Sequence, residues 1–353
     1  MRQRTVCLLL AAVPCAASAQ PSFHVDTLAA GVYAIVRHEP IAFVNNANSL
    51  VVVGDDGVLV VDAQFTRQAT NETIAAIRAL TNKPVRYVVN THWHDDHVAG
   101  NQVYRDSFPS VVFVSQANTR ADLIALGAPN RRGTVDGGPG FVARFKRLLA
   151  MGLGGDSTPV SPRERAAMES TIRVGEQYFA EAPGFRETLA TLTFDDALTL
   201  YLGSRVAKVR YLGPANTRGD AVVFVPDARV VATGDLLVYP VPFAFGAFPA
   251  SWRSALDSIA AFRPVAMLPG HGPAMRDDAY LRTVRDMLGA VVDQTRAAVA
   301  DGKTIDQVKA SVKLADYRAH VAGDDKWLNT MFTNFFLVPT VTQAFQEATR
   351  ARK

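Results

Sequence analysis

The sequence predicts a layered α/β sandwich followed by a helical C-terminal region. Short apolar runs bounded by Gly, Asp and Pro fall into two groups, at about 49–116 and 190–271, and helical patterns accompany each group. Two sheets with helices on their outer faces would bury the apolar side of every such element. From about Asp277 onward the chain has helical periodicity, which predicts a helical extension over 277–353.

The first β-rich group begins with a hairpin and continues with alternating helices and strands. Ile74, Ile77 and Leu80 share one helical face, and Pro84 follows soon after. Apolar runs around this helix have the length of buried strands. In chain order we expect the hairpin NSLVVV/VLVVDA around GDDG, the helix NETIAAIRAL, the strands VRYVVN and SVVFVS, and the helix QANTRADLIAL.

Residues of about 128–190 differ in character and predict a helical insert. GAPNRRGTVDGGPG has the composition of a loop, and the helical segments FVARFKRLLAMGL and SPRERAAMESTIRVGEQYF follow it. The second helix has Ser161 as its N-cap and Pro162 in its first turn. After the insert we expect the strands ATLTFDDALTLYLG and RVAKVRYLG, the hairpin AVVFVPDARVVATGD, the helix SWRSALDSIAAF and the strand VAMLPG, which ends at His271.

The first residues, MRQRTVCLLLAAVPCAASAQ, have the pattern of a secretory signal peptide. Arg2 and Arg4 precede a short apolar core, and Ala17-Ser18-Ala19 forms an A-x-A cleavage site. We therefore expect cleavage after Ala19, removal of residues 1–19 and a periplasmic or secreted protein. No later apolar run approaches the roughly 20 residues that span a bilayer, so no membrane association is expected after cleavage.

Cleavage would also remove both cysteines, Cys7 and Cys15, so that any metal must be held by His, Asp, Glu or Asn. Removing Arg2 and Arg4 from the 37 basic residues leaves 35 against 33 acidic residues. No dense Lys/Arg stripe occurs in the sequence, which argues against nucleic acid as a partner and leaves a small-molecule substrate as the expectation.

Three of the seven histidines lie in the segment VNTHWHDDHVAGN, directly after an expected strand. His92, His94, Asp96 and His97 form the pattern H-x-H-x-D-H, and imidazole and carboxylate are ligands that suit zinc and similar divalent ions. Four candidate ligands within six residues exceed what one site takes from a local segment. This favours two adjacent metals, each completed by ligands from elsewhere in the chain.

Two residues at other expected strand ends are candidates to complete these sites. Asp235 lies in VVATGDLL, and His271 lies in LPGHGP. With these residues in view, the segments THWHDDHVAGN, GPANTRGD, ATGDLL and LPGHG resemble, in order and approximate spacing, the metallo-β-lactamase superfamily over roughly residues 28–275. The resemblance implies an αββα sandwich with metals at one edge between the sheets. It implies a metallo-β-lactamase-like domain over 20–276, with the insert at about 128–190 inside it.

The resemblance also implies a role for each candidate residue. It assigns His92 and His94 to a first metal site, and Asp96, His97 and His271 to a second. Asp235 matches the aspartate that bridges both metals in glyoxalase II-like members. Asp62, in VLVVDA, matches a buried aspartate that supports the metal loop without binding metal itself.

Asn216, in GPANTRGD, departs from the family pattern, which usually has histidine there as third ligand of the first site. An amide oxygen is a much poorer zinc ligand than imidazole. We therefore expect one Zn²⁺ bound firmly at the second site and weak or conditional binding at the first. Nearby, VYPVPFAFGAF is aromatic, so Tyr239, Phe243 and Phe245 are candidates for an apolar substrate wall, with buried packing as an equal alternative.

These features predict a zinc-dependent hydrolase. Zinc lowers the pKa of bound water to about 7, and the resulting hydroxide would attack the carbonyl of a small amide, ester or thioester, with β-lactams foremost by resemblance. Asp96 is the expected catalytic residue that holds this nucleophile. One alternative is a degenerate periplasmic metal-binding protein without hydrolase activity, because of Asn216. Another is a hydrolase of thioesters or sulfur metabolites, since the whole-chain pattern also resembles exported members associated with sulfur or quinoprotein systems.

The C-terminal segment WLNTMFTNFFLVPTVTQAF is apolar and aromatic. It fits either packing over the core or a dimer interface, and we expect intramolecular packing. The oligomeric state and the substrate itself stay open at this stage.

Overall fold

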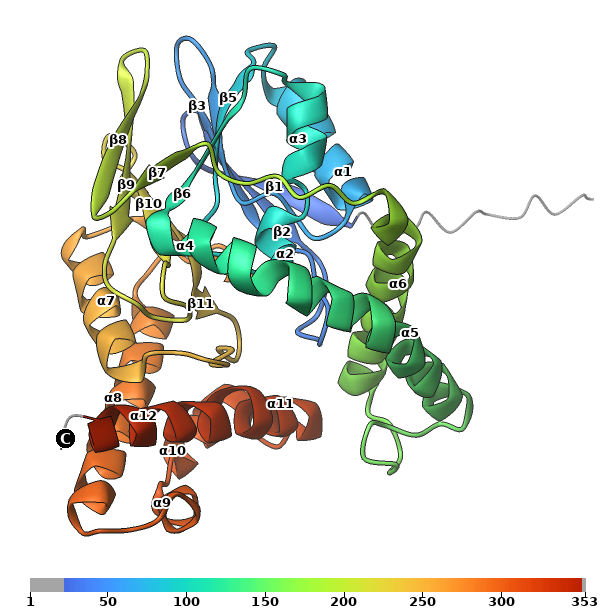
Figure 1. Cartoon of the computed structure of the whole chain (residues 1–353), viewed down its shortest axis with the longest axis vertical. Helices are drawn as coiled ribbons and strands as arrows, with labels where there is room; N and C mark the ends of the chain where they lie inside the picture. The colour runs from blue at the N-terminus through green and yellow to red at the C-terminus, as the bar shows by residue number, and fades with distance from the viewer. Residues whose placement is uncertain (1–21, 351–353) are drawn as a thin grey trace, which may run out of the picture.

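The computed structural model describes residues 22–350, so the predicted signal peptide lies outside the described residues. Two β-sheets face each other and helices cover both outer faces, as Figure 1 shows. The inner faces meet in an apolar layer, in which Leu50 and Val89 of the first sheet lie with Val223 and Leu268 of the second. The expected αββα sandwich is therefore confirmed.

The first sheet has seven strands in the order β1-β2-β3-β4-β5-β6-β7. Neighbours are antiparallel from β1 to β4 and parallel from β4 to β7. β3 and β4 form the expected hairpin, with Val52 opposite Leu59. The strands are β1 (Phe23–Ala29), β2 (Val32–Arg37), β3 (Ser49–Val53), β4 (Val58–Val61), β5 (Val85–Val89), β6 (Val112–Gln116) and β7 (Leu192–Phe194).

The second sheet has five strands in the order β12-β11-β10-β9-β8, all antiparallel except the pair β11 and β12. The run ATLTFDDALTLYLG, expected as strand, divides between the two sheets as β7 and β8. The strands are β8 (Ala197–Leu202), β9 (Arg205–Tyr211), β10 (Ala221–Val225), β11 (Val230–Val238) and β12 (Ala266–His271).

Helices cover the outer face of each sheet through separate apolar clusters. Ile77 of α1 and Tyr104 of α3 pack against the first sheet, and Trp252 of α7 and Leu288 of α8 pack against the second. A short turn, α2, carries part of the histidine motif. These elements are α1 (Arg67–Leu80), α2 (Asp95–Val98), α3 (Asn101–Ser107), α7 (Pro249–Ala261) and α8 (Ala279–Ala300).

The insert is helical, but its first part is not the loop that its composition predicts. GAPNRRGTVDGGPG lies mostly within α5, which crosses α6 in Figure 1. A Cβ at Gly138 would overlap the ring of Phe179, so this glycine is a point of close helix contact rather than a turn. The expected helix α4 (Ala117–Asp122) and the π-helical turn η1 (Leu123–Gly127) lead into the insert. The insert itself contains α5 (Ala128–Ala150), α6 (Pro162–Glu181, capped by Ser161 as expected) and η2 (Ala182–Gly184).

The C-terminal helices pack on the same molecule. Met331, Phe332, Phe336 and Val341 share one apolar cluster with Trp252 of α7, so the intramolecular packing that we expected is observed. Within residues 22–350, no helix combines the length and the hydropathy that crossing a bilayer requires. The C-terminal elements are α9 (Ile305–Ser311), α10 (Ala315–Ala322), α11 (Lys326–Met331), the π-helical turn η3 (Phe332–Leu337) and α12 (Val338–Arg350).

Candidate metal centre

The histidine motif lies where the carboxyl ends of strands from both sheets meet. The motif follows β5, Asp62 follows β4, Asp235 lies in β11, and His271 ends β12. Because β4 is parallel to β5 and β11 is parallel to β12, each pair ends at the same edge. Asn48 joins the sheets there: its amide donates to the carbonyls of Pro269 (3.0 Å) and Gly272 (2.8 Å).

The six predicted ligands come together at this edge. Nε2 of His92 lies 2.9 Å from Nδ1 of His94 and 3.6 Å from a carboxylate oxygen of Asp235. The other Asp235 oxygen lies 3.3 Å from Nε2 of His97 and 3.7 Å from that of His271. Asp96 Oδ2 lies 3.0 Å from the His271 nitrogen and 3.4 Å from the His97 nitrogen. Asp235 therefore lies between the two groups, as a bridging residue would.

Two sets of ligand atoms are close enough to share a cation: His92, His97 and Asp235 form one, and Asp96, His97 and His271 form the other. Nε2 of His97 and Oδ1 of Asp235 are buried, and neither has a hydrogen-bond partner anywhere in residues 22–350. Buried polar atoms without partners are rare in folded proteins. Because imidazole nitrogens and carboxylate oxygens lie close together in both sets, the residues present fit a divalent metal.

The ionisable groups of the cluster differ in the charge state that their surroundings favour. Burial, with His97 and His94 nearby, holds the pKa of His92 well below its ordinary value, so this imidazole is neutral and able to bind metal. Burial acts to raise the pKa of Asp96, but His97 and His271 outweigh it and lower that pKa well below its ordinary value. Burial acts to lower the pKa of His97, but Asp96 and Asp62 outweigh it and raise that pKa well above its ordinary value. The pKa of His271 is raised in the same way by Asp235 and Asp96, so both imidazoles must lose a proton when zinc binds.

Asp62 supports His97 from behind. Its Oδ2 lies 2.8 Å from Nδ1 of His97, and its Oδ1 accepts the N–H of Thr91 at 2.8 Å. Such a carboxylate fixes the orientation of a metal-binding imidazole and the tautomer that exposes Nε2. The structure thus places Asp62 where the resemblance implies.

Asn216 is buried beside the metal ligands and has a structural contact that its position in the sequence does not predict. Its Nδ2 donates a hydrogen bond to the carbonyl of Phe243. Since a carbonyl only accepts, the amide orientation is fixed, and Oδ1 is left without a partner in the described part of the chain. Asn216 lines the same cavity as His94 and Asp96, but Oδ1 itself is buried, so a group that binds Oδ1 must be enclosed with it.

A cavity of about 360 Å³ opens over the cluster. Phe243 and Phe245 line it, but Tyr239 does not. The Tyr239 ring instead packs edge-on against Tyr280, 5.1 Å away, and lines a different cavity. The expectation for Tyr239 is therefore corrected. Sequence reasoning missed the other lining residues. Asp95 lies within the histidine motif, and the rest occur in no motif: Ala42, Phe43, Val44, Asn45, Phe65, Asn130, Thr134 and Phe335.

The insert is joined to the motif by a buried ion pair. Arg131 of α5 donates to Asp95 at 2.5 Å, and the hydroxyl of Tyr178 of α6 donates to the same carboxylate at 3.1 Å. Burial raises the pKa of Asp95, against the opposing effect of Arg131. Asp95 immediately precedes Asp96, so this pair holds the turn that carries two of the ligands.

Comparisons with known proteins agree with this fold and cluster. Residues 42–271 match the family profile described as the metallo-beta-lactamase superfamily, and the chain belongs to that superfamily. A linear primary-alkylsulfatase from Pseudomonas sp. is 24% identical over 294 residues, which are 80% of this chain and 52% of the relative. The chain thus spans about half the length of the curated relative that it matches.

Solved structures are similar in fold. A metallo-beta-lactamase from Pontibacter korlensis has a TM-score of 0.53 at 18% identity, over 76% of this chain and 99% of the other. A stereoselective inverting sec-alkylsulfatase from Pseudomonas sp. has a TM-score of 0.62 at 15% identity, over 92% of this chain and 50% of the other. The relatives are named as hydrolases of two kinds, and their substrates are not transferred to this chain by likeness of fold.

Proposed function

We propose that the protein is a zinc-dependent hydrolase that cleaves an ester, thioester or amide bond in a small substrate. The observation that carries the proposal is the convergence of His and Asp side chains from both sheets beside a cavity. Five of the six expected ligands form two groups that could share a metal, and His94, Asp96, Asp235 and His271 line the cavity. When bound, a zinc ion lowers the pKa of water and acts as a Lewis acid toward the substrate oxygen. Asp96, His97 and His271 would hold it firmly, and His92, His94 and Asp235 would form the weaker site.

Asp96 is the residue best placed to move a proton. Its side chain is 25% exposed, whereas that of Asp235 is 4% exposed, so Asp96 reaches the cavity. The oxygen of Asp96 that does not bind metal can accept a proton from attacking water and return it to the leaving group, while Oδ2 stays with His97 and His271. Asp62 keeps Nε2 of His97 directed at the cluster throughout.

Hydrolysis of alkyl sulfates is the second candidate, favoured by the alkylsulfatase relative and by the 92% coverage in the sec-alkylsulfatase structure. One feature weighs against it. Among the described residues that line the cavity there is no Lys or Arg, so the sulfate charge would be balanced by metal alone. We also propose export through residues 1–19, which suits a substrate met outside the cytoplasm.

Turnover by the purified protein tests the proposal. We expect p-nitrophenyl esters, chromogenic thioesters or β-lactams to be hydrolysed, with activity lost after chelation and restored by Zn²⁺. Release of sulfate from an alkyl sulfate, with no ester cleavage, would favour the second candidate. Stoichiometric zinc without turnover of any of these compounds would instead indicate a metal-binding protein.

A further inference from the structure

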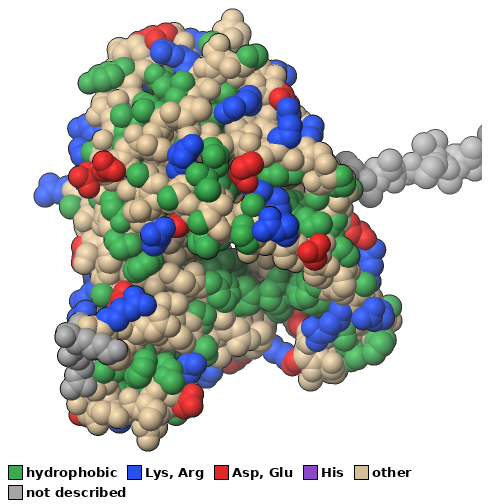
Figure 2. Space-filling model, in the orientation of Figure 1, with side chains coloured by type: hydrophobic (Ala, Val, Ile, Leu, Met, Phe, Trp, Pro, Cys, Tyr) green, Lys and Arg blue, Asp and Glu red, His purple; other side chains and the backbone are tan. Residues whose placement is uncertain are grey.

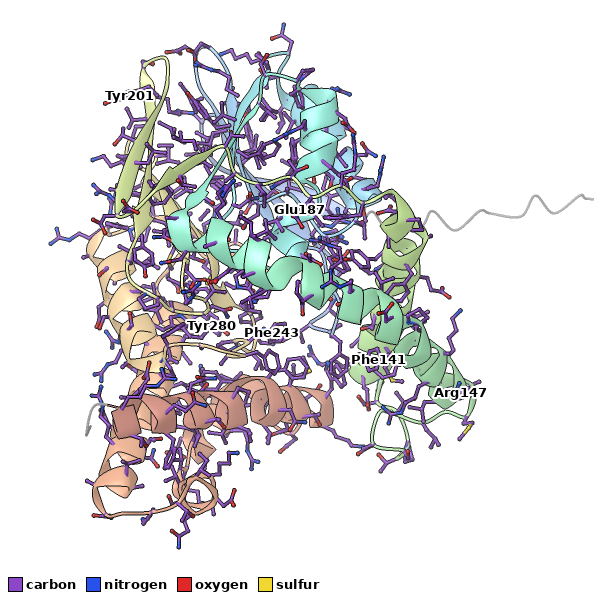
Figure 3. The ribbon with its side chains drawn as sticks, in the orientation of Figure 1. Phe141, Arg147, Glu187, Tyr201, Phe243 and Tyr280 are labelled. Carbon is purple, nitrogen blue, oxygen red and sulfur yellow. The ribbon has the colours of Figure 1, made fainter. Side chains whose placement is uncertain are left out.

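Aromatic side chains from distant parts of the chain gather beside the metal cluster. The ring of Phe335, in the C-terminal turn η3, lies 5.2 Å from that of Phe43, 5.1 Å from Phe243 and 5.0 Å from Phe245. Phe43 and Phe245 are 39% and 52% exposed, although large apolar side chains are usually buried. Figure 2 shows hydrophobic side chains in the hollow above the C-terminal helices, and Figure 3 shows Phe243 between these helices and α5.

The π-helical turn η3 binds the loop that carries two of these rings. A π-helical turn bonds residues five apart, which alters the usual helical pairing of carbonyls, and such turns are frequent at functional sites. Here the carbonyl of Phe335 accepts the N–H of Ala244 at 2.8 Å. On the metal side, Asn216 donates to the adjacent carbonyl of Phe243. The aromatic loop is thus held between the candidate metal centre and the C-terminal segment.

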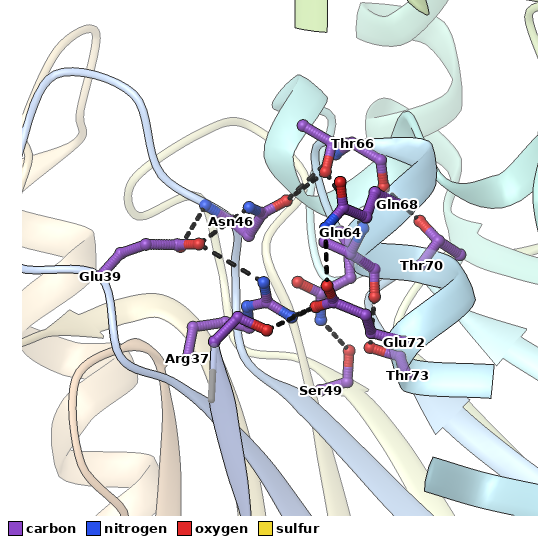
Figure 4. Close-up of polar contacts among 12 residues, drawn as sticks. Arg37, Glu39, Asn46, Ser49, Gln64, Thr66, Gln68, Thr70, Glu72 and Thr73 are labelled. Carbon is purple, nitrogen blue, oxygen red and sulfur yellow. Dashed lines mark hydrogen bonds and ion pairs between the residues drawn. The ribbon is translucent and has the colours of Figure 1, made fainter. Parts of the chain in front are cut away.

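The loop that carries Phe43 is also fixed. Asn46 donates through its backbone N–H and its side chain to Glu39, and its Oδ1 accepts the N–H groups of Phe65 and Thr66. Figure 4 shows these contacts, with Arg37 between Glu39 and Glu72. These contacts fix the backbone of the loop three residues from Phe43.

The charges of the cavity select against an anionic group away from the metals. Its charged lining residues, apart from histidine, are Asp95, Asp96 and Asp235, and the described lining includes no cation. Apolar groups gain free energy by leaving water for the aromatic wall, whereas a carboxylate there would lose hydration without meeting a cation from the described lining.

We propose that η3 is part of the substrate site and that Phe335 is a specificity-determining residue for an uncharged apolar acyl group. This inference rests on the proposed hydrolase function and adds to it the substrate class. The reacting carbonyl would lie at Asp96 and the metal ligands, with its apolar chain along Phe43, Phe245 and Phe335.

Chain-length dependence tests the inference. We would measure kcat/KM for p-nitrophenyl acetate and p-nitrophenyl octanoate with the wild type and with Phe335→Ala, and expect the octanoate-to-acetate ratio to fall about tenfold. Phe335→Leu should retain most of the preference. Phe345→Ala is the matched control, because Phe345 is also half-buried in the C-terminal helices but lies at another cavity. An unchanged ratio in Phe335→Ala would overturn the inference and leave the hydrolase function standing.

A binding measurement separates the two proposals if no ester is hydrolysed. The neutral fluorophore N-phenylnaphthylamine should bind the metal-free wild-type protein. It should bind Phe335→Ala about tenfold more weakly and Phe345→Ala as tightly as the wild type. That result without any turnover would remove the hydrolase function and retain an apolar site at Phe335. Binding that is absent, or equal in all variants, would overturn the apolar site.

Discussion

Nδ1 of His97 lies 2.8 Å from Oδ2 of Asp62, and the other Asp62 oxygen accepts the N–H of Thr91, so one buried carboxylate positions both the histidine and the start of the motif. This arrangement predicts that Asp62→Asn weakens zinc binding by about 10- to 100-fold, because the amide cannot supply the charge that supports the imidazole. Competition with a chromogenic chelator measures the affinity.

Asparagine is the suitable replacement because Asp62 has a φ of 63°, a left-handed conformation that Asn tolerates. Asp56→Asn, in the exposed hairpin turn, is the control. Equal zinc affinity in Asp62→Asn and wild type would show that the contact is structural only.

Restoring histidine at Asn216 should complete the first site. We expect zinc content to rise from about one to about two per chain in Asn216→His, as measured by elemental analysis. Asn216→Ala loses the contact with the Phe243 carbonyl without adding a ligand, so its zinc content should not rise. Two zinc ions in the wild type would instead mean that Asn216 does not weaken the first site.

Much of this centre could be predicted from the sequence, because four candidate ligands lie within six residues and His271 ends a short apolar run. Asp235 was expected at a strand end, but it lies inside β11, beside Gly234 where the pairing with β12 is irregular. The apolar wall of the cavity could not be predicted from the sequence. Phe43 and Phe335 lie near opposite ends of the chain and occur in no motif, and only the packing of the C-terminal helices brings their rings to 5.2 Å.

Some strands and helices could not be predicted either, because their local sequence does not show how they pack. β1 is an edge strand whose residues are largely exposed, so it lacks the buried alternation that identifies a strand in sequence. The start of α5 has the glycines of a loop, but Gly138 serves its packing against Phe179. The domain boundaries at 20–276 and 277–353 remain predictions, although the C-terminal helices share one apolar cluster with α7.

The pair between Arg131 and Asp95 makes a separate prediction about stability. Arg131→Met leaves the Asp95 carboxylate buried without its cation, and removal of one partner of such a pair typically destabilises by roughly 3–5 kcal/mol. Urea unfolding measures the change. The exposed neighbour variant Arg132→Met should be close to the wild type. Adding Asp95→Asn to Arg131→Met should recover part of the loss, and no recovery would show that the packing of Arg131, not its charge, matters.

Asp220 predicts a pH dependence. Its Oδ2 accepts the N–H of Thr217 at 2.6 Å, but its Oδ1 has no partner within residues 22–350, and burial raises its pKa to about 7. In the unfolded chain the carboxyl has the ordinary pKa of an aspartate, about 3.9. Between these values the folded protein binds more protons than the unfolded chain, so the stability that Asp220 contributes falls as pH rises from about 4 to 7.

Asp220→Asn stays neutral and should escape this loss. We expect urea unfolding of the metal-free protein to show that Asp220→Asn becomes more stable relative to the wild type between pH 5 and 8. The difference in the free energy of unfolding should change by on the order of 3 kcal/mol at most. The gain should level off above pH 8, where Asp220 is ionised in both states. Metal-free protein is needed because a bound cation near Asp235 would favour the ionised carboxylate and reduce the shift. A stability difference that does not change with pH would mean that Asp220 is already ionised in the folded protein at pH 5.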